Sequence, residues 1–319
     1  MTTRSDVLAA LRQAGEAGVS GEALAVRLGV SRVAVGKHVG ALREAGYTIE
    51  ALPGVGYRLV AVPDAPLPDE VARLLGSTLW VDLRGGGETG STNDDARALG
   101  AKGAPEGTVV LASRQSAGRG RLGRTWESPE GGVYLSAVLR PQVAPVAVAS
   151  LALAVALGVV RGLETLGAEP RLKWPNDVLL GDGKVAGVLL EMTAETDRVD
   201  RVIVGVGINA RRPPAGVVAG AAYLTDAGVD ASFASITAAV LDGIADAYVA
   251  WSTGGFTVLR EQYAARSAMD GSIVAVRDLQ GSVRAQGEVV GVDDEGRLLV
   301  DGGGSVTAVS SGEVTLRRP

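Results

Sequence analysis

The spacing of the hydrophobic positions changes twice along the chain. Near the N-terminus apolar side chains recur every three or four residues, which is the period of short amphipathic helices. The long middle part alternates strand-like apolar runs with apolar helices, and the final part holds short strand-like runs separated by glycines. Three prolines, Pro63, Pro66 and Pro68, make a stiff connector after the first part. The pattern predicts three domains, at residues 1–62, 69–268 and 270–319.

The first domain has the pattern of a winged helix-turn-helix. The predicted elements are helices at residues 6–14, 21–28 and 32–45 and strands at residues 47–52 and 57–60. Ser31 caps the last helix, which carries Arg32, Lys37 and Arg43 on its polar face. A helix that begins in this way after a glycine turn suits the major groove of DNA. We therefore expect Ser31 and the three basic residues to bind DNA; the alternative is a small helical bundle whose charges are only solvated.

The middle domain favours an α+β fold with a mixed sheet, because its helices are separated by several strands joined through tight hairpins. Strands are expected at residues 78–83, 108–113, 133–139, 171–174, 178–180, 185–192 and 201–208, and helices at 93–101, 146–166, 235–251 and 257–268. The sequence Gly205-Val206-Gly207 lacks the third glycine and the following helix of a dinucleotide-binding fingerprint. The last domain, with five short strands, predicts a small β-barrel of the SH3-like type.

Composition excludes several kinds of site. The chain has no cysteine and one histidine, His38, so disulfides, thiol nucleophiles and zinc sites built on Cys or several His are ruled out. The net charge is −5, although residues 1–60 hold seven basic and five acidic residues. Residues 143–160 carry no charge, but they are too rich in alanine for a convincing membrane span. With no apolar segment typical of a signal peptide near Met1, we expect a cytoplasmic protein without membrane contact.

Two segments of the middle domain carry the candidate chemistry. Residues 114–126 contain four arginines spaced by glycines, as a wrap around an anion needs. Residues 173–187 contain Lys173-Trp174-Pro175-Asn176-Asp177 and then Gly183-Lys184-Val185-Ala186-Gly187. Together they indicate a site where a phosphorylated ligand meets a carboxylate; the alternative for the arginine-rich segment is a solvated, flexible loop. Ser91-Thr92-Asn93 precedes a helix, and there Thr92 and Asp95 also fit an ordinary capping box.

These motifs resemble the biotin–protein ligases, specifically the bifunctional ligase and biotin-operon repressor type (BirA family). The resemblance covers residues 31–38, 90–93, 115–126, 173–177, 183–187, 205–209 and 311–317, and therefore runs nearly end to end. It implies that biotin and ATP form biotinyl-5′-adenylate and pyrophosphate, after which biotin passes to a lysine of a carrier protein. Two anions must approach in the first step, so cations have to neutralise the developing charge.

The resemblance also implies roles for individual residues. For catalysis it implies Lys184, Arg119 and Arg121. For biotin it implies Ser91, Thr92, Asn93, Gln115, Arg119, Gly120, Arg121, Lys184 and Gly187. For ATP it implies Arg121, Arg124, Trp126, Asn176 and Asn209. Mg²⁺ is expected to accompany ATP, and no metal site built by the protein itself is expected.

The implied partners are the biotin carboxyl carrier protein of acetyl-CoA carboxylase, operator DNA, and a second copy of the chain when adenylate is bound. Two alternatives remain at this point: a lipoate– or octanoate–protein ligase, and a repressor that senses a small molecule without ligase activity. Three departures from the family pattern stand out. Gly36 replaces a larger residue that is usual in the recognition helix. Gly90 stands where the family tends to have a bulkier or acidic residue, and residues 211–223 contain the unusual pairs Pro213-Pro214 and Val217-Val218.

Overall fold

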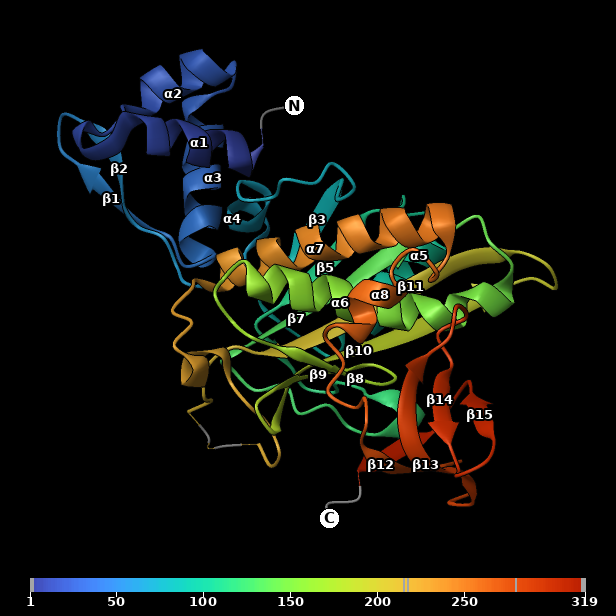
Figure 1. The fold of residues 1–319 in the computed structure, drawn as a ribbon. Helices are drawn as coiled ribbons and strands as arrows, with labels where there is room; N and C mark the ends of the chain where they lie inside the picture. Colours follow the sequence, from blue (N-terminus) through green and yellow to red (C-terminus); the bar gives the residue numbers. More distant parts are fainter. Residues whose placement is uncertain (1–2, 215, 217, 279, 317–319) are drawn as a thin grey trace. The chain divides into compact units, whose positions relative to one another are not determined.

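The computed structural model describes residues 3–214, 216, 218–278 and 280–316 (Figure 1). The chain divides into two compact units, Met1–Asp64 and Ala65–Pro319, which are described separately below.

The first unit is the winged helix-turn-helix that the hydrophobic pattern predicts. Its elements are α1 (Arg4–Ala14), the 3-10 turn Gly15–Ala17, α2 (Gly21–Leu28), α3 (Arg32–Glu44), β1 (Thr48–Leu52) and β2 (Gly56–Ala61). The Ser20 and Ser31 hydroxyls accept backbone N–H groups at 3.0 and 3.1 Å and so begin α2 and α3. Val35, Val39 and Leu42 bury the inner face of α3. The antiparallel β1–β2 pair forms the wing.

The second unit is built on a seven-stranded mixed sheet with the order β3-β5-β7-β11-β10-β9-β8. Its strands are β3 (Asp82–Gly85), β5 (Thr108–Ala112), β7 (Gly132–Leu139), β8 (Arg171–Lys173), β9 (Asp177–Leu180), β10 (Gly183–Ala194) and β11 (Val199–Asn209). Its helices are α4 (Pro68–Ala72), α5 (Thr92–Ala101), α6 (Val148–Glu164), α7 (Phe233–Gly254) and α8 (Arg260–Ala264), with 3-10 turns at Arg121–Gly123, Pro145–Ala147 and Leu224–Ala227. Only β3 and β5 pair in parallel within this sheet, so the predicted mixed sheet is confirmed.

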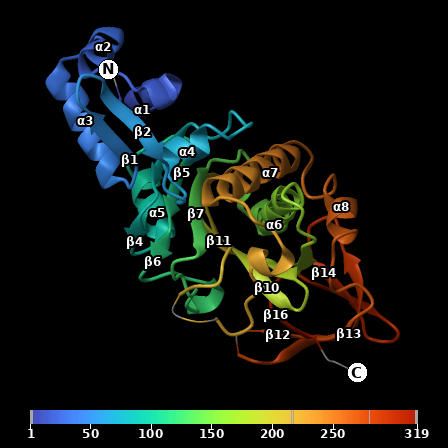
Figure 2. The same cartoon turned by 90° about the vertical axis from the view of Figure 1, so that its left-hand side faces the viewer.

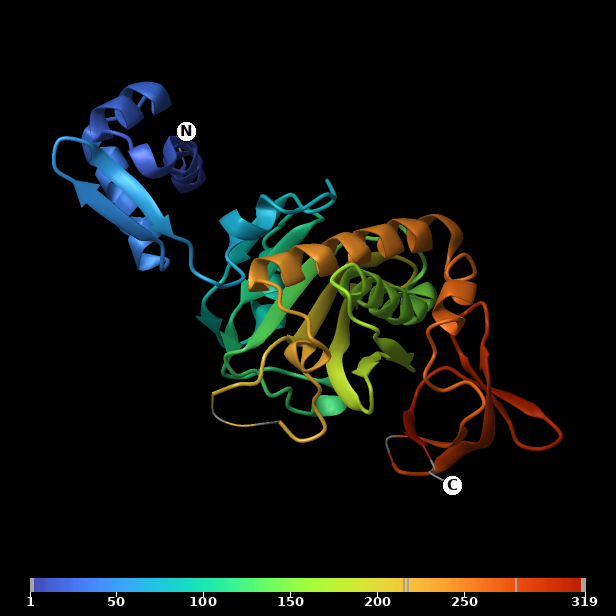
Figure 3. The same cartoon turned by 60° about the vertical axis from the view of Figure 1, so that its left-hand side comes forward.

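The two faces of this sheet carry different helices, because successive strand residues point to opposite sides. Val109 and Leu111 of β5 belong to the large core shared with α6 and α7. Val110 between them packs with Ala96 of α5, together with Val138 and Ile203. Figures 2 and 3 show α6 and α7 side by side over one face and α5 on the other.

The two long helices of the core approach each other closely through glycines. A side-chain carbon at Gly158 of α6 would lie 2.6 Å from the Gly243 carbonyl oxygen of α7 and 2.7 Å from Ile244 Cα. Pro145–Glu164 and Phe233–Gly254 are long and apolar enough to cross a membrane, but 72% and 61% of their most apolar windows are buried within the fold. The uncharged stretch at residues 143–160 is therefore largely core, as expected from its composition.

The C-terminal part of the second unit is a five-stranded antiparallel sheet with the order β15-β14-β13-β12-β16. The strands are β12 (Ile273–Arg277), β13 (Val283–Val292), β14 (Leu298–Asp301), β15 (Val306–Val309) and β16 (Glu313–Leu316). The sheet is found, but its closure into the predicted barrel is not shown, because the described pairings leave β15 and β16 as its two edges. The Trp174 indole N–H donates to the Gly296 carbonyl at 3.0 Å and ties this sheet to the larger one.

Several predicted element boundaries are wrong. The strand expected from residue 78 begins at Asp82, because the buried Trp80 indole turns inward and donates to the Leu241 carbonyl at 2.9 Å. The proline-rich connector ends in α4, which Pro68 begins at its first turn. A two-residue parallel pair, β4 (Glu88–Thr89) and β6 (Arg114–Gln115), was not predicted because elements this short leave no periodic pattern.

Candidate active site

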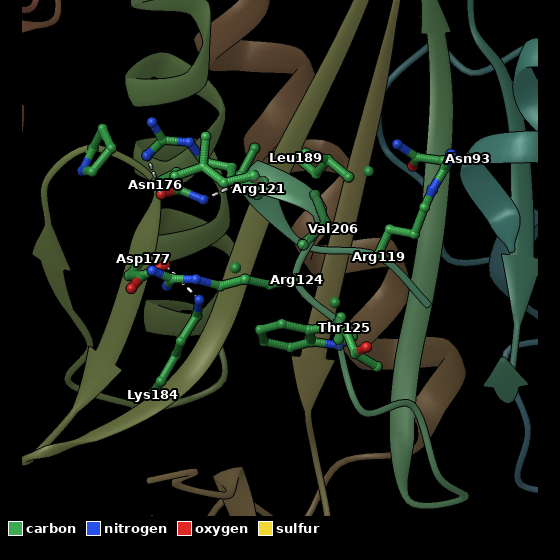
Figure 4. A pocket seen from close by; sticks show the side chains of 18 of the residues that line it. Asn93, Arg119, Arg121, Arg124, Thr125, Asn176, Asp177, Lys184, Leu189 and Val206 are labelled. Atoms are coloured by element: carbon green, nitrogen blue, oxygen red, sulfur yellow. Dashed lines mark hydrogen bonds and ion pairs between the residues drawn. The ribbon is translucent and has the colours of Figure 1, made fainter. Parts of the chain in front are cut away.

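A cavity of about 210 Å³ lies on the α5 face of the seven-stranded sheet (Figure 4). It is lined by Ser91, Thr92, Asn93, Gln115, Arg119, Gly120, Arg121, Leu122, Arg124, Thr125, Trp126, Lys173, Trp174, Pro175, Asn176, Asp177, Lys184, Gly187, Val188, Leu189, Gly205, Val206, Gly207, Gly312 and Val314. The three motif segments of the middle domain thus meet at one place, together with residues of the C-terminal sheet.

Glycines clear the sheet surface beneath this cavity. Gly187 of β10 pairs with Gly207 of β11, and Gly205 follows two residues away on the same face. A side-chain carbon at Gly207 would overlap the Trp126 indole, at 2.6 Å from its Cε2, and one at Gly187 would lie 3.0 Å from its Cζ3. A side chain at Gly205 would overlap the Asn93 amide. The three glycines therefore let Trp126 and Asn93 lie directly on the strands.

One end of the cavity is a neutral polar cluster. Gln115 Oε1 accepts the Thr92 backbone N–H at 2.8 Å and the Thr92 hydroxyl at 3.1 Å. The buried Ser136 hydroxyl lies 2.7 Å from Thr92 Oγ1 and 2.6 Å from Asn93 Oδ1 and can donate to either. The capping box considered for Thr92 and Asp95 is wrong, because Ser91 is the N-cap residue and Asp95 instead accepts the Thr89 hydroxyl at 2.6 Å. The Thr92 side chain is thus available to the cavity.

The arginine-rich segment crosses the cavity as a short hairpin. Arg119 and Thr125 form an isolated antiparallel bridge, and the Gly120 N–H donates to the Arg124 carbonyl at 2.7 Å. At the tip, Leu122 and Gly123 both have positive φ, at 61° and 74°. Positive φ costs glycine little but strains a leucine.

The arginines of this hairpin point to opposite ends of the cavity (Figure 4). Arg119 extends toward Asn93 and donates to Asp94 at 2.7 Å and to Glu191 at 3.2 Å. Arg121 extends the other way and donates to Asn176 Oδ1 at 3.0 Å. Burial lowers the pKa of the Arg121 guanidinium, while the nearby Asp177 carboxylate opposes that shift.

Lys184 completes the cationic end. Its Nζ lies 2.5 Å from Asp177 Oδ1 and 4.9 Å from the centroid of the Trp126 ring. Asp177 stands on β9 opposite Gly187, and the preceding Asn176 donates its amide to the Val188 carbonyl at 2.6 Å. Neighbouring strands thus hold the lysine and the carboxylate close to Arg121 of the hairpin, where an anionic ligand could exchange with the carboxylate.

A second cavity, of about 720 Å³, adjoins the first. It shares Arg124, Thr125, Trp126 and Lys184 with the first cavity. Its lining continues through Asn209, Pro213, Gly216, Val218, Ala219, Gly220 and Ala221. Asn209 lines this second cavity, and its side-chain amide donates to the Lys184 carbonyl at 3.0 Å. The Trp126 indole N–H is buried at the boundary between the cavities and has no hydrogen-bond partner among the described residues.

The structure brings together nearly all the residues predicted for the site. Every residue expected to contact biotin lines the first cavity, as do Arg124, Trp126 and Asn176. Asn209 faces only the second cavity. The prediction missed Asp94, Ser136 and Glu191, whose hydrogen bonds reach the site residues from outside any motif. A polar residue in the otherwise apolar strand of residues 133–139 was the one available signal for Ser136.

The predicted DNA-binding residues do not all share one surface role. Ser31 caps α3, and Arg32 is exposed beside Glu22, with 3.9 Å between guanidinium and carboxylate. Lys37 is exposed on the same helix. The Arg43 guanidinium instead donates twice to the Ile49 carbonyl of the wing, at 2.9 and 2.6 Å. Arg43 thus holds the wing to α3.

The comparisons with known proteins agree across the whole chain. Residues 88–209 match the model of the Biotin/lipoate A/B protein ligase family, residues 3–58 match an HTH domain, and residues 271–317 match the Biotin protein ligase C terminal domain. The chain is 35% identical to the bifunctional ligase/repressor BirA of Bacillus subtilis (strain 168), over 99% of each chain. The chain belongs to the bifunctional biotin–protein ligase and repressor family.

Other members of the biotin–protein ligase family support the same assignment. The bifunctional ligase/repressor BirA of Escherichia coli (strain K12) is 33% identical, over 93% of this chain and 92% of its own. The biotin protein ligase of Aquifex aeolicus, solved in complex with biotin and ATP, superposes with a TM-score of 0.64 at 30% identity. It covers 75% of this chain and 99% of its own.

Proposed function

We propose that the chain joins biotin to ATP, forming biotinyl-5′-adenylate and pyrophosphate, and then transfers biotin to a lysine of the biotin carboxyl carrier protein of acetyl-CoA carboxylase. One observation carries the proposal. A single cavity has a neutral hydrogen-bonding cluster at one end and Lys184, Arg121 and Arg124 at the other. Biotin needs both, because its ureido group is neutral and polar and its carboxylate must meet a phosphate.

The neutral cluster suits a ureido group. Asn93 can offer an amide N–H and an oxygen lone pair, and Thr92 offers a hydroxyl oxygen. Gln115 can offer its second amide N–H, because its oxygen already accepts twice from Thr92. Leu189, Val206 and Val314 supply apolar surface in the same cavity. We assign the ring system of biotin to this end and its valeryl chain to the path toward Lys184. Ser91, Arg119, Gly120 and Gly187 complete the assigned biotin contacts.

The cationic end suits adenylate formation. A carboxylate oxygen of biotin attacks the α-phosphorus of ATP, and the bond from that phosphorus to the oxygen bridging to the β-phosphate breaks as pyrophosphate leaves. Negative charge grows on the phosphoryl oxygens, where preorganised cations lower the barrier. We assign Lys184 to these phosphoryl oxygens once it has left Asp177, and Arg121 and Arg124 to contacts with the phosphates. Trp126 and Asn209, at the second cavity, are assigned to the nucleoside. In the second step the carrier lysine attacks the acyl carbon and AMP leaves.

Mg²⁺ is assigned to the phosphates of ATP. Among the described residues no group of three His, Asp or Glu side chains could hold a metal by itself. Magnesium commonly binds through one or two protein oxygens together with substrate phosphates and water. Asp177 and Asn176 present such oxygens at the cationic end, so these residues fit an ion that arrives with the nucleotide and screens its charge.

The N-terminal unit is assigned to operator DNA, and the adenylate to the role of corepressor. Ser31, Arg32 and Lys37 face outward from α3, whereas Arg43 acts through the wing. One winged helix reads a half-site, so we assign a homodimer that forms when adenylate is bound. We also assign a cytoplasmic location, domain limits at residues 1–62, 69–268 and 270–319, and an SH3-like barrel for the last domain.

The site disfavours the two alternatives. A repressor that only sensed a ligand would not need Lys184, Arg121 and Arg124 together at one anion site. A lipoate or octanoate ligase acts on acyl groups without a ureido ring, so it would leave the buried Thr92, Asn93 and Ser136 cluster without a polar ligand.

The deciding experiment incubates the full chain with ATP, Mg²⁺, biotin and a carrier domain, followed by a streptavidin blot. Biotin on the carrier, absent when the carrier lysine is replaced by arginine, is the expected result. A parallel reaction with lipoate or octanoate in place of biotin tests the alternative ligases. Transfer of either acid in preference to biotin would overturn the proposal.

A further inference from the structure

Glu191 accepts hydrogen bonds from three side chains, two on α5 and one on the arginine-rich hairpin, without lining the cavity itself. It accepts the Asn93 side-chain amide at 2.8 Å, Arg97 at 3.3 Å and Arg119 at 3.2 Å. Glu191 lies on the same face of β10 as Gly187 and is 28% exposed in its side chain. It therefore connects α5, the arginine-rich hairpin and the sheet at the neutral end of the cavity.

The hydrogen bond between Glu191 and Asn93 sets the orientation of the Asn93 side-chain amide. Asn93 is 5% exposed, and its oxygen is within 2.6 Å of the Ser136 hydroxyl. An asparagine amide has a donor end and an acceptor end of nearly equal shape, so its neighbours select the orientation. A carboxylate only accepts hydrogen bonds, so Glu191 requires the nitrogen of Asn93 on its side. One amide hydrogen and one oxygen lone pair are then left in fixed directions for a ligand.

We propose that Glu191 is a positioning residue for recognition of the ureido group: it fixes the amide orientation of Asn93 and, through Arg119, anchors the hairpin at the same end of the cavity. The inference rests on the proposed function, because it gives the neutral cluster the ureido group of biotin. Glu191 touches no substrate atom in this assignment and acts through Asn93.

Asp94 provides a matched control. It accepts hydrogen bonds from the same two arginines, Arg97 and Arg119, and its side chain is 44% exposed against 28% for Glu191. Among the described residues, the hydrogen-bond partners of its side chain do not include Asn93. Replacing Asp94 removes a negative charge from the same cluster while leaving the orientation of Asn93 untouched.

The test compares Glu191→Leu, Glu191→Gln and Asp94→Asn in the full chain. Each is assayed for biotin affinity by calorimetry and for biotin-dependent exchange of pyrophosphate into ATP. We expect Glu191→Leu to weaken biotin binding by about tenfold to a hundredfold, the range for a hydrogen bond to a charged group, with the KM for ATP unchanged. Glu191→Gln should recover most of the affinity, because its amide oxygen can still accept from Asn93. Asp94→Asn should lose much less biotin affinity than Glu191→Leu, because the change reaches Arg119 but not the Asn93 amide.

A double-mutant cycle with Asn93→Ala gives an independent readout. Once the Asn93 amide is gone, Glu191→Leu should cost little further biotin affinity. Equal losses from Asp94→Asn and Glu191→Leu, equal losses from both Glu191 variants, or additive losses in the cycle would each overturn the inference. If Glu191→Leu does not fold, Glu191→Ala takes its place in every comparison.

The outcomes separate this inference from the proposed function. If the unchanged protein exchanges pyrophosphate only when biotin is present and Glu191→Leu behaves like it, the role of Glu191 alone is refuted. If the unchanged protein shows no biotin-dependent exchange, the assigned chemistry fails first.

Discussion

Replacing Lys184 by methionine separates its electrostatic role from its structural one. Methionine keeps an apolar stem over Trp126 but removes the ammonium group that lies 2.5 Å from Asp177. In the proposed reaction that ammonium meets the charge growing between the biotin carboxylate and the α-phosphate. The substitution should therefore slow adenylate formation far more than it weakens the fold.

The structure sets the size of both effects. The Lys184–Asp177 pair is 32% and 24% exposed, and partly solvated pairs of this kind stabilise a protein by about 1 kcal/mol or less. For a unit of this size that corresponds to a fall in Tm of about 2–4 °C. Losing one preorganised contact to transition-state charge costs about 3 kcal/mol, or on the order of a hundredfold in rate.

Single-turnover pyrophosphate release measures the rate, and thermal unfolding measures the stability. Lys173→Met is the control, because Lys173 lines the same cavity and its loss changes the charge equally. We expect Lys173→Met to slow the step much less. Near-normal pyrophosphate release by Lys184→Met would refute the assigned role. If both variants released pyrophosphate equally slowly, the effect would come from the net charge of the cavity and not from the position of Lys184.

Three further predictions concern stability, the hairpin and DNA. Gly158→Ala should destabilise the second unit by about 1–3 kcal/mol, because the added carbon would overlap the backbone of α7. Gly36→Ala has open space around it and should stabilise the first unit by up to about 1 kcal/mol. Thermal unfolding of both variants checks these opposite signs. Trypsin should cut residues 116–124 more slowly with biotin and ATP present, since bound anions order such a loop, and equal cleavage rates would contradict this. Arg32→Ala should weaken operator binding in a gel shift without lowering the Tm. Arg43→Ala should lower the Tm of the first unit, because it releases the wing from α3. The reverse pattern would contradict both assignments.

The sequence determined the local elements and the chemical character of the site. Helix and strand periods follow from which positions are apolar, so α2 and α3 lie within a residue of their predicted limits. The residue types in the arginine-rich segment and in the strands with Lys173 and Lys184 indicate an anion-binding site. Their joint appearance with Ser91-Thr92-Asn93 also carried the resemblance to the ligase family.

Only the tertiary structure decided which residues touch. Asn93 and Glu191 are 98 positions apart. They meet because alternate residues of β10, including Gly187, Leu189 and Glu191, point to the face of the sheet that α5 covers. The sequence pattern could not show that Arg119 and Arg121, two positions apart, reach opposite ends of one cavity. It also could not show that Arg43 holds the wing. Periodicity reports which side of an element is buried, whereas the pairing of long polar side chains depends on the distances that the assembled sheet and helices impose.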